Sequence, residues 1–235
     1  MGLGLYGRVS RNDAESDLAL IQTVGTEFAE ASGLRNFFAL RASDNRIEFY
    51  FHPAAEPVEL SGDAGTLTLS AKTSGAGPGY HRFIVQFMDL LAERLEFQWT
   101  GQADGSSPDG TGFFEHRDFD LLQDEMRIFL RTLLSKITER RDWSGLMLNM
   151  PIGLLPRLTG VATPMGDWPM ETLQLAVTDD TFLQEFARQF FPWWDKTLTA
   201  EAMRNSSIAW MWTDAKWHPP KTKTKGAASR GPWRR

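Results

Sequence analysis

Apolar residues recur at intervals of three and four along several stretches of the chain, a spacing that predicts amphipathic helices. The clearest helix spans residues 117–138, with acidic residues near its beginning and basic residues near its end, as the helix dipole favours. Further helices are predicted over residues 14–31, 80–94, 181–191 and 199–213. Asp179 or Asp180 supplies an N-cap for the helix beginning at residue 181.

Alternation of apolar and polar residues predicts strands in other stretches. These strands span residues 3–9, 36–42, 46–52, 66–72, 95–99 and 171–177. Ser43, Asp44 and Asn45 are turn formers, so the second and third strands form a predicted hairpin. Together the elements predict an α+β fold, in which helices pack on a mixed or antiparallel sheet of about five strands.

Glycine, proline and tryptophan divide the chain into segments. Residues 101–112 are predicted to form a loop, and residues 146–170, with four prolines, an irregular packed segment. Eight of the nine tryptophans lie beyond residue 142. We therefore predict an α+β domain at 1–142, an aromatic-rich, mostly helical segment at 143–218 packed on it, and a basic tail at 219–235.

The composition is that of an ordinary globular protein, with 42% hydrophobic and 23% charged residues among 235. The absence of cysteine excludes a disulfide framework, a thiolate zinc site, an iron–sulfur cluster and a cysteine nucleophile. The sequence contains no run of apolar residues long enough to span a membrane, and no signal peptide is expected, because its first ten residues lack an apolar core followed by a small-residue cleavage site. A cytoplasmic, bacterial setting fits these features, and no membrane association or cofactor is expected.

Charge is distributed unevenly along the chain. Residues 216–235 hold seven basic residues and no acidic one, whereas residues 1–215 carry a net charge of −12. An acidic body repels phosphate and is a poor nucleic-acid surface, so nucleic acid is expected to bind only through the tail. The residues expected to dock the tail on an acidic partner are Lys221, Lys223, Lys225, Trp233, Arg234 and Arg235.

Histidines and carboxylates begin two of the predicted helices. His81 lies at the start of one, and Glu115, His116 and Asp118 lie at the start of the next. If these helices packed side by side in the same sense, the four side chains could act as acid and base or hold a divalent metal. The alternative is that these polar residues simply cap the helices.

Glycines at 75, 77 and 79 precede the helix at 80–94, a position where backbone N–H groups can bind phosphate. The spacing matches neither the dinucleotide-binding nor the P-loop pattern, and a plain linker is the favoured interpretation. The sequence also contains no nucleophile elbow, zinc-protease or kinase motif.

Aromatic residues gather near the end of the predicted fold. Trp210 and Trp212 lie about 200° apart around a helix, and Trp193 and Trp194 about 100° apart, so these rings cannot all face one core. We expect some of them, together with Trp217, to contact a partner. The alternative is that they only build the core.

These observations favour a protein–protein interaction subunit, such as an adaptor, inhibitor or immunity-type component of a bacterial complex. It would bind a protein partner or a second copy of itself through the tryptophans and the tail. A metal-dependent hydrolase built on His81, Glu115, His116 and Asp118 is one alternative. Nucleic-acid association through the tail is the other.

Overall fold

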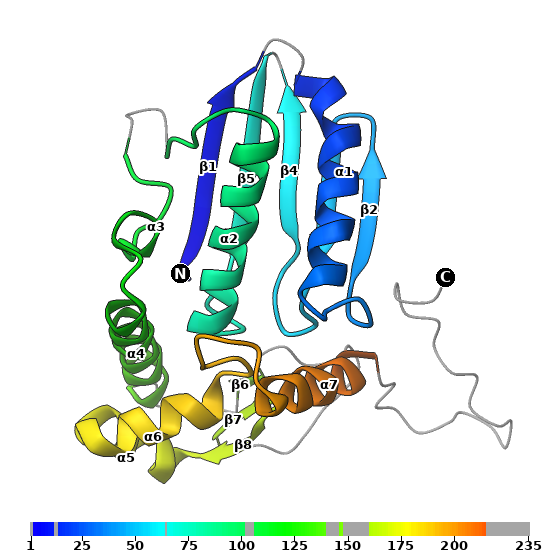
Figure 1. Ribbon diagram of the computed structural model, residues 1–235. Helices are drawn as coiled ribbons and strands as arrows, with labels where there is room; N and C mark the ends of the chain where they lie inside the picture. Colours follow the sequence, from blue (N-terminus) through cyan, green and yellow to red (C-terminus); the bar gives the residue numbers. More distant parts are fainter. Residues whose placement is uncertain are drawn as a thin grey trace, which may run out of the picture.

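The chain forms a five-stranded antiparallel sheet with helices packed on it, followed by a smaller, mostly helical part (Figure 1). The computed structural model describes residues 2–11, 14–63, 65–101, 106–139, 146–147 and 160–214. The predicted α+β class is confirmed.

The first elements are β1 (Gly4–Ser10), α1 (Ala14–Ala31), β2 (Ala39–Ser43), β3 (Arg46–Tyr50), β4 (Val58–Asp63), β5 (Thr66–Lys72) and α2 (Pro78–Arg94). The later elements are α3 (Phe113–His116), α4 (Phe119–Thr138), β6 (Leu146–Met147), β7 (Gly160–Thr163), β8 (Gly166–Pro169), α5 (Met170–Thr178), α6 (Asp180–Phe190) and α7 (Ala200–Asp214).

The strands of the large sheet follow the order β1-β5-β4-β3-β2, and every neighbouring pair is antiparallel. Ile47, Leu60 and Leu69 lie side by side in register, and all three are fully buried. On the other face the hydroxyls of Ser61 and Thr68 lie 2.7 Å apart and remain partly exposed. The alternating sequence therefore buries one face and leaves the other to solvent.

The buried face is covered by α1 and α2, which cross the same side of the sheet (Figure 1). The close approach of α1 depends on Gly25, because a Cβ at this position would lie 2.2 Å from Cε1 of Phe49. At the first turn of α2, Pro78 lacks an N–H that the helix would leave unbonded in any case. The predicted helix at residues 80–94 is confirmed with one more half-turn.

In the N-terminal part, one predicted strand is absent and one observed strand was missed. Residues 95–99 do not form a strand, because Glu96 has a positive φ of 54° and the N–H of Phe97 donates back to the carbonyl of Ala92. Their alternation reflects burial of Leu95 and Trp99 in an irregular segment. β4 was not predicted, since Pro57 precedes it and a glycine interrupts its pattern.

The C-terminal part also departs from expectation. The predicted strand at 171–177 is wrong, because these residues belong to α5. Leu173 and Ala176, three residues apart, are its buried residues, and α5 packs against α4 and α6. β7 and β8 form an antiparallel pair within the stretch expected to be irregular. The helix expected at 181–191 is confirmed as α6, and Asp179 caps it by accepting a 2.9 Å bond from the N–H of Phe182.

The buried core runs without interruption from Leu5 in β1 to Ala202 in α7. The α4–α7 helices and the small sheet gather at one end of the large sheet (Figure 1). The domain division at residues 142 and 218 stays a prediction. No helix among the described residues is long and apolar enough to cross a membrane.

Candidate functional site

The segment after α6 packs against the beginning of α2. The N–H of Trp193 donates to the carbonyl of Ala76 at 2.9 Å, and the N–H of Gly79 donates to the carbonyl of Trp193 at 3.1 Å. A Cβ on Gly79 would lie 2.2 Å from Cδ1 of Trp193, and one on Gly77 would lie 2.7 Å from its carbonyl oxygen. The glycines therefore admit the chain's own backbone, and a protein carbonyl occupies the helix start where phosphate would bind.

Two of the tryptophans expected to face a partner lie inside the protein. Trp193 is 3% exposed, with its ring 5.4 Å from that of Phe83, and Trp194 is 7% exposed and stacks on Phe191. The ring of Trp193 therefore joins the C-terminal part to α2, whereas that of Trp194 packs within the C-terminal part. Trp210 and Trp212 on α7 are partly exposed. Trp217 lies outside the described residues.

His52, which follows β3, forms a buried polar link to α7. The Nδ1 atom of His52 accepts the N–H of Ala54 at 3.1 Å, so the proton of the neutral ring lies on Nε2. Nε2 then donates to Oγ of Ser206 at 2.7 Å, and Ser206 donates to the carbonyl of Ala202. A histidine that acts as a general base must instead accept a hydrogen bond from the serine hydroxyl. This pair therefore ties two elements together, and burial lowers the pKa of His52 to about 3.

His81 belongs to a second buried group, with Thr73 and Asp109. Its Nδ1 lies 2.8 Å from Oγ1 of Thr73, and its Nε2 lies 3.2 Å from Oδ2 of Asp109. The second contact has an ion-pair distance but not the alignment of a hydrogen bond. Asp109 also accepts bonds from the N–H and hydroxyl of Thr111 and from the N–H of Phe114.

The carboxylate of Asp109 is held in its ionised form. Burial raises its pKa, but contacts with His81 and hydrogen bonds from Thr111 lower it further, to about 2 overall. His81 is 0% exposed and Asp109 is 3% exposed. The group therefore fixes the 106–114 segment against α2. Sequence reasoning did not select Asp109, because nothing distinguishes it from the other polar residues of a loop.

The other candidate catalytic residues lie in a different environment from His81. Glu115 and His116 in α3 and the following Asp118 are all exposed. Asp118 caps α4, its carboxylate accepting the N–H groups of Asp120 and Leu121 at 3.0 and 3.2 Å. Within the described ranges, no group of three or more His, Cys, Asp or Glu residues is placed to hold a metal ion. The four predicted residues thus do not form such a metal-binding group, and their catalytic role stays a prediction.

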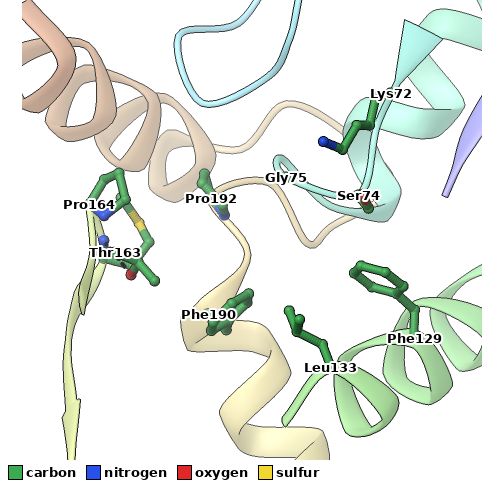
Figure 2. Close-up of a pocket in the computed structure, with 10 residues that line it drawn as sticks. Lys72, Ser74, Gly75, Phe129, Leu133, Thr163, Pro164, Phe190 and Pro192 are labelled. Atoms are coloured by element: carbon green, nitrogen blue, oxygen red, sulfur yellow. Dashed lines mark hydrogen bonds between the residues drawn. The ribbon is translucent and has the colours of Figure 1, made fainter. Parts of the chain in front are cut away.

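A pocket of about 160 Å³ opens where the two parts of the protein meet, and we call it the junction pocket (Figure 2). Figure 2 shows side chains of α4 and α6 turned toward the same space as Lys72, which extends from the end of β5. Most of its wall is apolar, and its polar groups come from Lys72, Ser74 and Thr163. Its apolar side chains are Phe129, Leu133, Pro164, Met165, Phe190 and Pro192.

The junction pocket was not predicted from the sequence. Phe129 and Leu133 continue the apolar stripe of α4, and they resemble the buried residues of that stripe. In the structure, however, both remain partly exposed. The ammonium group of Lys72 pairs with Glu56, so the one positive charge at the pocket is already balanced.

The tail residues expected to dock on a partner, Lys221, Lys223, Lys225, Trp233, Arg234 and Arg235, lie outside the described residues. Comparisons with models of known protein families, with curated proteins and with solved structures find no match to this chain. The site alone therefore carries the functional argument.

Proposed function

We propose that this chain is a binding subunit of a protein complex and holds an apolar side chain of its partner in the junction pocket. The observation that carries this proposal is an open pocket with apolar walls, formed by α4, α6, the β7–β8 turn and the segment after β5. Its polar groups are few, so it favours an apolar group over a charged one.

The size of the pocket sets the size of the occupant. An apolar cavity of about 150 Å³ binds a benzene molecule. The junction pocket, at about 160 Å³, therefore suits one ring or one branched aliphatic side chain. Side chains that insert into pockets of this kind carry much of the binding energy of a protein interface.

The polar groups elsewhere favour a binding role over catalysis. The imidazoles of His52 and His81 are buried and engaged with other parts of the chain. Neither imidazole faces solvent, so a substrate cannot reach it without a rearrangement of the core. The hydrolase built on His81, Glu115, His116 and Asp118 stays a prediction without a shared site, and the two hypotheses for the tail also stay predictions.

Filling the pocket tests the proposal. Leu133→Trp places an indole in the junction pocket, and Ile128→Trp is the matched control, because Ile128 lies on the same helix but is 58% exposed. We expect added indole to shift NMR signals of the pocket residues in the wild type and in Ile128→Trp, but not in Leu133→Trp. Thermal unfolding checks that both variants fold.

A second measurement tests the protein partner. Proteins captured by the wild type and by Ile128→Trp, but lost with Leu133→Trp, are expected to use the pocket. If indole leaves the wild-type spectrum unchanged, or if Leu133→Trp binds indole and partners as the control does, the proposal is wrong.

A further inference from the structure

The two edges of the large sheet differ in their backbone hydrogen bonds. At the outer edge of β1, the N–H of Tyr6 donates to the carbonyl of Pro108 at 2.7 Å. Arg8 and Thr100 exchange two more backbone bonds, at 2.8 and 3.0 Å. For β2, the described part of the chain contributes no backbone hydrogen bond other than those to β3. The described residues therefore close the β1 edge with backbone hydrogen bonds and leave the β2 edge open.

The turn before β3 determines which groups of β2 point outward. Ser43 pairs with Arg46 across a two-residue turn, and such a flanking pair exchanges hydrogen bonds. Bonded and non-bonded pairs then alternate, so Arg41 bonds to β3 while Leu40 and Ala42 direct their N–H and C=O groups away from it. An added strand would meet the backbone groups of these two residues.

The side chains of β2 define the residues that such a strand should carry. Arg41 is paired in register with Glu48 on the solvent face, and its guanidinium donates to the hydroxyl of Tyr50 at 3.1 Å. Among the described residues, no carboxylate lies within ion-pair distance of Arg41. An acidic residue opposite Arg41 would complete the row of charges, because opposite charges on facing positions stabilise a sheet.

On the face of β2 that is turned toward the core, an added strand should carry apolar residues. Leu40 is paired with Phe49, which belongs to the buried core, yet Leu40 itself is only partly buried. The side chain of Ala42 is on the same face as that of Leu40, two residues along. Apolar residues on both sides of the acidic one would extend the core beyond β2.

We propose that the outer edge of β2 accepts an extended segment of another protein as a sixth strand, with an acidic residue opposite Arg41 and apolar residues on either side. This surface is separate from the junction pocket, and the proposal does not depend on that pocket. A second copy of β2 is a poor occupant, since pairing about a two-fold axis at Arg41 sets two guanidinium groups opposite each other.

Selection from a displayed library of random nine-residue peptides tests this proposal on the full chain. We expect the enriched peptides to contain Asp or Glu between two apolar residues. Ala42→Pro removes only an outward N–H, which an edge strand tolerates, and Ala42→Ser keeps that N–H as the matched control. The affinity of the enriched peptides should fall about ten-fold or more with Ala42→Pro and stay unchanged with Ala42→Ser.

Charge reversal tests the specificity of the same edge. Selection on Arg41→Glu should enrich Lys or Arg at the position that prefers acid in the wild type. Thermal unfolding identifies any variant that fails to fold. The proposal is overturned if no peptide is enriched, if the enriched peptides bind Ala42→Pro as tightly as the wild type, or if charge reversal leaves the selected residue unchanged. Sedimentation that reveals a dimer dissociated by Ala42→Pro would also overturn it, by assigning the edge to a second copy.

Discussion

Mild acid should destabilise this protein through His52. The folded protein keeps the His52 ring neutral, because Nδ1 accepts the N–H of Ala54 and burial lowers the pKa to about 3. In the unfolded chain the ring has its ordinary pKa of 6.5. Below pH 6.5 the imidazole therefore binds a proton in the unfolded state but not in the folded state, and the free energy of unfolding falls as the pH falls.

The size of the effect follows from the difference in proton binding. Each pH unit below 6.5 costs about 1.4 kcal/mol as long as the folded ring stays neutral. Lowering the pH from 7 to 5 should therefore remove about 2 kcal/mol of the free energy of unfolding through this one residue. The loss continues until the pH approaches the folded pKa of about 3.

Urea unfolding at pH 7, 6 and 5 measures this loss, with His52→Gln as the reference variant. Glutamine keeps an N–H donor for Ser206 but does not titrate. The variant should be less stable at pH 7, yet it should lose about 2 kcal/mol less than the wild type on going to pH 5. Equal losses in the two proteins would refute the assignment of a neutral, buried imidazole.

Three further substitutions test the packing and polar contacts. Gly79→Ala should lower the free energy of unfolding, measured by chemical denaturation, by about 2 kcal/mol or more through overpacking. Gly110→Ala is the control and should cost far less, because nothing lies within 4 Å of its new Cβ; equal costs for the two variants would contradict the packing argument. Asp109→Asn should lower the free energy of unfolding by about 2 kcal/mol, because an amide cannot accept all the buried hydrogen bonds that the carboxylate receives from Thr111 and Phe114. A neutral effect would show that Asp109 does not fix the 106–114 segment. Asp118→Ala should cost about 1 kcal/mol in thermal unfolding through loss of a helix cap, and an unchanged midpoint would show that the cap does not matter.

The spacing of apolar residues predicted those helices and strands in which the buried residues recur with the period of that helix or strand. The helix at 14–31 and the strand at 66–72 have the predicted bounds, because each exposes one face and buries the other. The pattern at 171–177 misled because Leu173, Leu175 and Val177 alternate in sequence although they lie on a helix. Tertiary packing of α5 against its neighbours decides that case, and a local window does not contain this information.

The buried polar group around His81 and the buried tryptophans were harder to predict, since their residues meet only through the fold. Thr73, His81 and Asp109 come from three different segments, and the carboxylate partner of His81 lies in a loop with several other polar residues. Trp193 and Trp194 looked like candidates for a partner because neighbouring helical residues diverge. They follow the end of α6 instead, where irregular backbone turns both rings inward.

The contact between Trp193 and α2 has a consequence for the order of folding during synthesis. The rings of Tyr80 and Phe83 lie 6.3 and 5.4 Å from Trp193, which is made more than a hundred residues later. At a synthesis rate of about 5–20 residues per second, the rings of Tyr80 and Phe83 stay without their contact to Trp193 for several seconds or longer. A nascent chain halted before residue 193 should therefore attract chaperones at the start of α2, and the last stage of folding should coincide with arrival of the C-terminal part.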